Sequence, residues 1–183
     1  ASVDQTGVGE LMEMAIERTG TEVFISASVG FTDVRAEMDE LKILSPLAVL
    51  TNGVFTDKNL NGLQRFLAIM RDKAPDALVG ACTNTPGLVL EKLADMSEVQ
   101  IVMAPVNKNG SYMRPSQEAS MGGMVHARKR GKILIGMQTL AAGEIRPDDA
   151  FPYVKDKVDA VAVGIASSIE ITETLRVARK AFH

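Results

Sequence analysis

The sequence predicts an α/β fold in which strand–helix units repeat around a parallel sheet. Two observations support this prediction: six short apolar runs recur along the 183 residues, and longer amphipathic stretches separate them. Strand–helix alternation requires right-handed crossover connections, which place the strands parallel to one another.

The expected strands are rich in Val, Ile, Leu and Ala, and they hardly alternate with polar residues. This pattern is typical of strands that are buried on both faces, so we expect helices on both sides of the sheet. The runs are EVFISAS from Glu22, PLAVLTN from Pro46, ALVGACT from Ala77, VQIVMAPV from Val99, KILIGMQT from Lys132 and DAVAVGIA from Asp159.

The expected helices carry apolar residues at helical spacing. Thr85 is a plausible N-cap, and Pro86 then takes the first helical position. The Gly122–Gly123 pair weakens one helix by roughly 1 kcal/mol per glycine. The predicted helices cover residues 8–18, 60–73, 86–95, 115–130, 147–155 and 168–182.

The number of units is too small for a complete eight-unit barrel, which needs about 200 residues or more. We therefore expect residues 1–183 to form one TIM-barrel-like domain of about six units that is incomplete. An open, doubly wound sheet and a sheet covered by a second subunit are the alternatives. Bare parallel edges invite association, which favours a homo-oligomer.

Composition excludes several classes of protein. The net charge is −3 and the pI about 5.5, which disfavours nucleic acid or an anionic membrane as the main partner. The basic stretch Arg128, Lys129, Arg130 and Lys132 closes an expected helix, where cations offset the helix dipole. We expect a cytoplasmic protein, because there is no signal-like N-terminus or membrane-spanning apolar run.

The only cysteine, Cys82, and two histidines leave few options for metal chemistry. A single cysteine excludes an internal disulfide and the usual multi-cysteine zinc or iron–sulfur sites, so we expect no metal site. Cys82 ends a strand, and a small buried packing residue is the favoured interpretation over a reactive thiol.

Ligands of parallel α/β folds bind at the carboxyl ends of the strands, and the loops there are polar. Turn formation alone also explains Asn, Gly, Thr and Asp in such loops. Lys108 and Tyr112 are candidates for acid or electrostatic roles, and Asp57 or Glu144 for a base. The candidate substrate-binding residues are Asn52, Asn84, Asn107 and Arg114.

The last two loops predict an anion site. GIASSIE places Gly164, Ser167 and Ser168 between a strand and a helix start, where N–H groups and the helix dipole favour phosphate. A plain serine N-cap is the alternative. The preceding loop, TLAAGE from Thr139, lies alongside in the parallel arrangement.

The C-terminal third, KILIGMQTLAAGEIRPDDAFPYV and VDAVAVGIASSIEITETLRVA, resembles the last two units of the aldo/keto reductase barrel. The earlier runs resemble its third to sixth strands more loosely. The resemblance implies that residues 138–143 and 164–168 bind the phosphate of NADP. It also implies that the catalytic tetrad is absent: the lysine position falls at Ser28, the histidine position near Thr51 or Asn52, and the other two in a missing unit.

A second resemblance is to uncharacterised aldolase-type barrel proteins, in which TNG and TNTPG read THG and THxPG. If those histidines bind a metal, Asn52 and Asn84 would bind it poorly.

Three functions follow as hypotheses. The first is a barrel protein that binds a phosphorylated, anionic small molecule and carries out a reaction that the sequence does not name. The second is an NADP-dependent oxidoreductase of aldo/keto reductase type. The third is a non-catalytic, truncated barrel that acts through oligomerisation.

Overall fold

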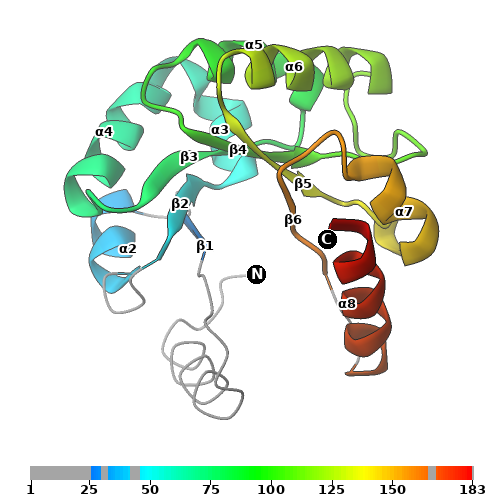
Figure 1. Ribbon diagram of the computed structural model, residues 1–183. Helices are drawn as coiled ribbons and strands as arrows, with labels where there is room; N and C mark the ends of the chain where they lie inside the picture. The colour runs from blue at the N-terminus through cyan, green and yellow to red at the C-terminus, as the bar shows by residue number, and fades with distance from the viewer. Residues whose placement is uncertain (1–25, 30–32, 42–45, 165–167, 183) are drawn as a thin grey trace.

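A computed structural model describes residues 26–29, 33–41, 46–164 and 168–182. Its centre is a six-stranded sheet in which the strands lie in chain order, β1 to β6 (Figure 1). Every neighbouring pair is parallel. The strands are β1 (Ser26–Val29), β2 (Ala48–Thr51), β3 (Leu78–Cys82), β4 (Ile101–Pro105), β5 (Ile133–Met137) and β6 (Ala160–Val161).

The predicted α/β class and the incomplete barrel are confirmed. Figure 1 shows a curved sheet with the helices in an arc around its outside. Within the described residues the sheet stays open, because β1 and β6 each pair with a single neighbour. The predicted helix over residues 8–18 and the first part of the run from Glu22 lie outside the described residues.

Helices connect successive strands, and most of them match the predicted ranges. They are α2 (Val34–Leu41), α3 (Gly53–Asn59), α4 (Leu63–Lys73), α5 (Pro86–Asp95), α6 (Gln117–Lys129), α7 (Pro147–Val154) and α8 (Ser168–Phe182), with the 3-10 turns η2 (Leu60–Gly62) and η3 (Ala141–Gly143). Two of them, α2 and α3, are absent from the prediction. Both are short, and polar side chains cap both: Asp33 accepts from Arg35 N, and Asn52 accepts from Val54 N.

The main core lies between the sheet and the helices. Strand residues such as Val49, Val79 and Val102 are at most 1% exposed and pack against helical Leu67 and Leu90. Each of these helices therefore has one apolar face, which explains the helical spacing in the sequence.

The other face of the sheet corrects one prediction. We expected helices on both faces, but the cluster on this face consists of strand residues alone: Ala48, Leu50 and Ile101 are buried, and Leu78, Met103, Ile133 and Ile135 are partly buried. Curvature brings these side chains together, as in a barrel interior. The apolar strand pattern therefore reflects a barrel rather than a three-layer sandwich.

Glycine allows α5 and α6 to approach closely. A Cβ at Gly123 would lie 2.8 Å from Leu90 Cβ, and a Cβ at Gly87 would lie 2.8 Å from Ala119 Cβ. Gly122, by contrast, has open space around it. The glycine pair that weakens α6 locally therefore includes one residue that the helix packing needs.

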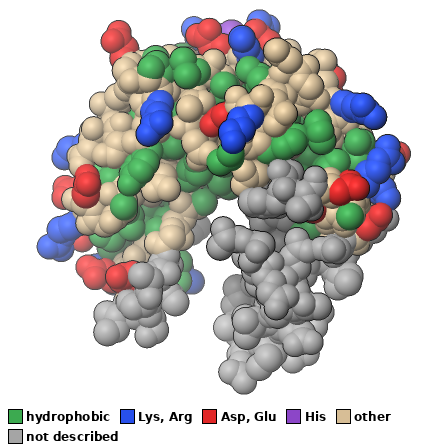
Figure 2. Space-filling view, turned by 180° about the vertical axis from the view of Figure 1, so that it is seen from behind, with side chains coloured by type: hydrophobic (Ala, Val, Ile, Leu, Met, Phe, Trp, Pro, Cys, Tyr) green, Lys and Arg blue, Asp and Glu red, His purple; other side chains and the backbone are tan. Residues whose placement is uncertain are grey.

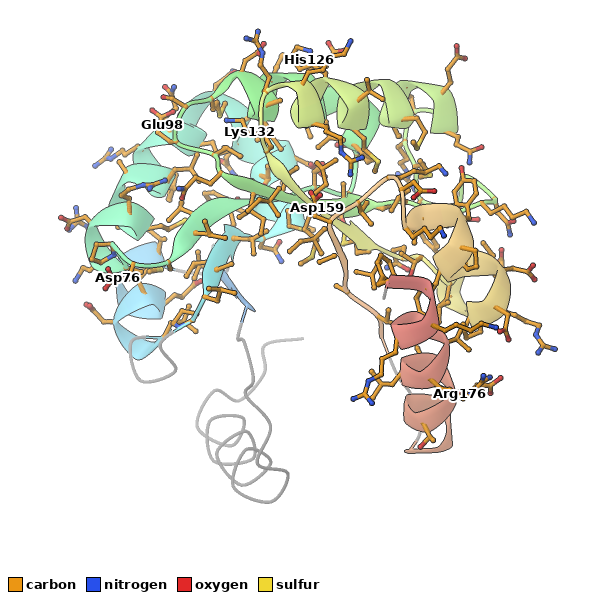
Figure 3. All side chains as sticks on the ribbon, viewed as in Figure 1. Asp76, Glu98, His126, Lys132, Asp159 and Arg176 are labelled. Carbon is orange, nitrogen blue, oxygen red and sulfur yellow. The ribbon has the colours of Figure 1, made fainter. Side chains whose placement is uncertain are left out.

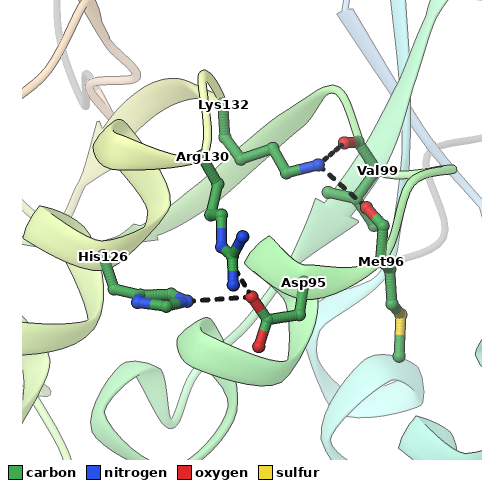
Figure 4. A network of polar contacts seen from close by, with 6 residues as sticks. All are labelled: Asp95, Met96, Val99, His126, Arg130 and Lys132. Carbon is green, nitrogen blue, oxygen red and sulfur yellow. Dashed lines mark hydrogen bonds and ion pairs between the residues drawn. The ribbon is translucent and has the colours of Figure 1, made fainter.

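The basic stretch at the end of α6 binds groups of the same chain (Figure 4). Arg130 Nε lies 2.9 Å from Asp95 Oδ1, and His126 Nε2 lies 3.0 Å from the same oxygen. Lys132 Nζ donates to the carbonyls of Met96 at 2.8 Å and Val99 at 2.6 Å. These contacts join α6 to α5 and to the loop before β4.

Figure 2 shows charged side chains of both signs in small groups on the face that it draws. None of the helices in the described part of the chain is both long and apolar enough to cross a membrane.

Candidate binding site at the carboxyl edge of the sheet

Hydrogen bonds join the loops at the carboxyl edge of the sheet to one another. Because all strands are parallel, the loops after β2, β3, β4 and β5 gather at this edge. Each neighbouring pair among these four loops is cross-linked, through Asp57, Gly87 and Asn107 in turn. The edge is therefore a connected framework rather than a set of independent loops.

The first link uses Asp57, the predicted base. Its carboxylate accepts from the Thr83 hydroxyl at 2.5 Å and from the Asn84 N–H at 3.0 Å. Thr83 is fully buried and in turn accepts from Thr85 N. Both carboxylate oxygens thus hold α3 against the loop after β3, which favours a structural role for Asp57.

Asn52 and Asn84 lie on either side of this link. The Asn52 side chain caps α3 by accepting from Val54 N at 2.9 Å and Phe55 N at 3.3 Å, so its oxygen is engaged. Asn84 is exposed, and its amide lies over Gly53, where a Cβ would be 2.7 Å from Asn84 Nδ2. Of the two asparagines, Asn84 presents the more accessible amide.

The second and third links fix the loop after β4. Gly87 N donates to Arg114 O at 2.8 Å. The fully buried Asn107 donates through Nδ2 to Ser111 O at 2.7 Å and to Gln138 O at 3.1 Å, and its Oδ1 accepts from Ser111 N at 3.0 Å. Asn107 therefore positions two loops, and these hydrogen bonds already engage both polar atoms of its side chain.

Gln117 is a residue of the site that the sequence analysis missed. Its Nε2 lies within hydrogen-bond distance of Asn107 O at 3.1 Å, Lys108 O at 3.3 Å and the Tyr153 hydroxyl at 3.1 Å. It reinforces the same loop from the first turn of α6. Its place just after the Ser116 N-cap was the available signal.

The anchored loop presents three predicted site residues to solvent. Lys108 and Arg114 are exposed, and neither has an ion-pair partner within the described part of the chain. Tyr112 is 52% exposed and has a left-handed backbone, with φ of 63°. Such a conformation costs a non-glycine residue on the order of 1 kcal/mol or more, and the Asn107 and Gln117 bonds hold the loop in this shape.

The loop after β5 has an unusual backbone. Positive φ occurs at Gln138 (55°), Ala141 (47°), Ala142 (58°) and Gly143 (94°). Thr139 is 1% exposed. Among the buried side-chain nitrogen and oxygen atoms of the described residues, its hydroxyl oxygen is the one without a hydrogen-bond partner. A buried hydroxyl without a hydrogen-bond partner costs about 1–3 kcal/mol of stability. The loop after β5 carries this cost in the described part of the chain.

The loop after β6 is described only in part. Gly164 is exposed, Ser167 lies outside the described residues, and Ser168 begins α8. The predicted phosphate site formed by both loops therefore stays a prediction on this side.

Cys82 lies at the end of β3, where burial, and then the charge of Asp57, raise the thiol pKa to about 12. Its Sγ lies 3.7 Å from Met137 Sδ. Such a thiol is protonated and unreactive at neutral pH. Across the described residues no cluster of three or more His, Cys, Asp or Glu could hold a metal ion.

Comparison with solved structures shows that the fold is similar to that of aldo-keto reductase barrels. A protein from Pseudomonas aeruginosa that is classed with the aldo-keto reductases is 16% identical, with a TM-score of 0.65 over 99% of this chain and 86% of its own. The holo form of an aldo-keto reductase from Bacillus halodurans is 11% identical, with a TM-score of 0.68 over 93% and 71%.

A glycerophosphoryl diester phosphodiesterase from Parabacteroides distasonis is also similar, at 12% identity and a TM-score of 0.52 over 90% of this chain and 54% of its own. No protein-family model and no curated protein matches the sequence. At these identities the likeness shows the fold alone, and the fold does not fix the function.

Proposed function

We propose that the protein binds a phosphorylated small molecule at the carboxyl edge of the sheet, between the loops after β4 and β5. The observation that carries this proposal is the anchored loop that presents Lys108 and Arg114 without acidic partners. Two unpaired cations on a fixed backbone favour an anion, and a guanidinium matches the oxygens of a phosphoryl group.

The neighbouring loop supports the same ligand class. Left-handed residues turn consecutive backbone N–H groups toward one side and form concavities that bind anions. The loop at residues 138–143 has four such residues; Ala141 N and Gly143 N already donate within the loop, and the partnerless Thr139 hydroxyl lies in it. Asn107 Nδ2 bonds to Gln138 O at 3.1 Å, so this loop lies directly beside the loop that carries the cations.

The side chains also limit the chemistry that we propose. The exposed Tyr112 hydroxyl is the best-placed group to donate a proton to a bound ligand, with Lys108 as its electrostatic neighbour. The two hydrogen bonds that Asp57 accepts favour a structural role over that of a base, and the raised pKa of Cys82 disfavours it as a nucleophile. The reaction that follows binding is left open.

Calorimetric titration of the full chain with inorganic phosphate and glucose 6-phosphate tests this proposal. We expect saturable binding that weakens at least tenfold in Lys108→Gln/Arg114→Gln. The matched control is Lys129→Gln/Lys155→Gln, which removes the same charge from exposed lysines at the ends of α6 and α7. Equal binding by both double variants, or no binding by the wild type, would contradict the proposal.

A second candidate is a reductase-type dinucleotide site, favoured by the similarity to reductase folds. Gln138, Thr139 and Gly143 would hold the cofactor phosphate, and the left-handed loop fits an anion there. The nicotinamide ring, when bound, supplies a hydride. The histidine of the reductase tetrad does not carry over, because Thr51 is fully buried and bonds to Thr56 at 2.8 Å, and Asn52 caps α3.

Fluorescence titration with NADPH separates the two candidates. Saturable binding that phosphate weakens and Thr139→Val reduces supports the dinucleotide site. Binding of glucose 6-phosphate without binding of NADPH leaves the first proposal standing alone.

A further inference from the structure

A hollow in the described part of the molecule is lined by residues of α3, η2, α4 and α5, and by none of the loops after β4 and β5. It has a volume of about 410 Å³, within the range of small-molecule pockets. One wall is the turn that leads from α3 into α4, and Lys92 on α5 forms the other. The residues that line it are Asp57, Lys58, Asn59, Leu60, Asn61, Gly62, Phe66 and Lys92.

The charge in this hollow is positive. Lys58 and Lys92 are exposed, come from different elements and have no acidic partner within the described part of the chain. Asp57 is the carboxylate in the lining, and the Thr83 hydroxyl and Asn84 N–H already bind both of its oxygens. The hollow thus carries two lysine charges against one carboxylate charge, which favours an anion in it.

The remaining lining residues add polar and apolar contacts. Asn59 Nδ2 is held by Phe55 O at 2.9 Å, which leaves Oδ1 as an acceptor, and Asn61 is exposed. Phe66 is fixed by an edge-to-face contact with Phe55, with ring centroids 4.5 Å apart. Together with Leu60 it provides a rigid apolar surface that a ring can pack against.

We propose that this hollow binds a ring-bearing organic phosphate of nucleotide size, with Lys58 and Lys92 on the phosphate and with Leu60 and Phe66 against the ring. The site shares Asp57 with the carboxyl-edge framework but none of the residues proposed to bind the ligand there, and it does not depend on the proposed function. Asn59 and Asn61 would recognise polar groups of the ring or the sugar.

Calorimetric titration of the full chain with ADP tests the proposal. We expect saturable binding that weakens at least tenfold in Lys58→Gln/Lys92→Gln and is retained in Lys58→Arg/Lys92→Arg, which keeps both charges. The charge-matched control Lys129→Gln/Lys155→Gln keeps wild-type affinity. Circular dichroism verifies that each variant is folded.

Three results would overturn the proposal: no ADP binding by the wild type, equal binding by Lys58→Gln/Lys92→Gln, or equal loss in the control variant. If only Lys108→Gln/Arg114→Gln and Thr139→Val lose ADP, the nucleotide binds at the carboxyl edge. That outcome would contradict a nucleotide site in this hollow and would leave the proposed function at the carboxyl edge standing.

Discussion

The two edges of the sheet use their polar side chains differently. At the amino edge, long side chains satisfy backbone groups: Lys132 binds two carbonyls, Arg71 binds Glu98 O, and Asp159 accepts from Leu134 N. Figure 3 shows Lys132 and Asp159 close to the starts of β5 and β6. At the carboxyl edge the framework is equally well connected, but it leaves Lys108, Arg114 and the Thr139 hydroxyl without partners.

Under the proposed function, this difference would divide stability and ligand binding between two sets of residues in one fold. In barrels, polar groups at the amino end serve stability, whereas unmatched groups at the carboxyl end serve ligands. Here the separation also runs within the carboxyl edge, because Asn107, Thr83 and Asp57 build the framework that Lys108 and Arg114 project from. We therefore expect changes in the framework residues to lower stability, and changes in the projecting residues to weaken ligand binding.

The largest expected effect concerns Cys82, the thiol at the carboxyl edge. Its pKa of about 12, against an ordinary value of 9.0, lowers the thiolate fraction at pH 8 by about a thousandfold. Alkylation by iodoacetamide should therefore be slower than for the unfolded chain by two to three orders of magnitude. Rapid modification of the folded protein would show that Cys82 is a reactive thiol. The carboxyl edge would then carry a reactive group that the amino edge lacks.

Replacing Asn107 should cost the most stability. Asn107→Ala removes three part-buried hydrogen bonds, to Ser111 N, Ser111 O and Gln138 O, and should lower the free energy of unfolding by about 3 kcal/mol. Asn84→Ala is the matched control, since that side chain is exposed, and should change it by less than about 0.5 kcal/mol. Urea unfolding measures the free energy of unfolding of both variants. Similar losses in the two would show that Asn107 does not stabilise the framework.

Lys132→Met tests the amino edge. The change keeps the apolar stem and removes the bonds to Met96 O and Val99 O, so stability should fall by about 1–2 kcal/mol while phosphate binding stays unchanged. Lys129→Met, at an exposed site on the same helix end, should be close to neutral. If Lys132→Met weakened phosphate binding, the two edges would not be independent.

The smallest expected effect is the pH dependence of Asp95. The His126 hydrogen bond and Arg130 hold the pKa of Asp95 below its ordinary value. A carboxyl with a lowered folded pKa stabilises the protein above the unfolded pKa of about 3.9 and loses that contribution as pH falls through the folded pKa. The Tm difference between wild type and Asp95→Asn should be present at pH 6 and shrink below pH 4. A difference that persists unchanged at pH 2 would contradict this origin.

The sequence was sufficient for the strands and most helices, because burial against one sheet face imposes clear apolar patterns. It was insufficient for α2 and α3. These helices are short, and the residues that cap them, Asp33 and Asn52, are of types that also form turns. The expectation of helices on both faces of the sheet was wrong for a different reason. A barrel interior and a sheet face covered by helices both require apolar strand residues, so the sequence pattern does not distinguish them.

For the site, the sequence located the loops but not the roles within them. Asn107 and Lys108 are adjacent, yet one is enclosed and the other projects. That distinction depends on distant partners: Asn107 and Gln138 lie 31 residues apart, and Thr83 and Asp57 lie 26 apart. No local pattern reveals such contacts, and a partnerless Thr139 looks like any threonine that follows a strand.

The most direct test of the division within the carboxyl edge compares two buried threonines. Thr83 is 0% exposed and hydrogen-bonded, whereas Thr139 is 1% exposed and lacks a partner. Urea unfolding without ligand should show that Thr83→Val loses about 2 kcal/mol, because Asp57 and Thr85 N lose a partner. Thr139→Val should be as stable as the wild type or more stable by about 1 kcal/mol. An equal loss in both variants would show that the Thr139 hydroxyl serves the fold, and it would contradict the account.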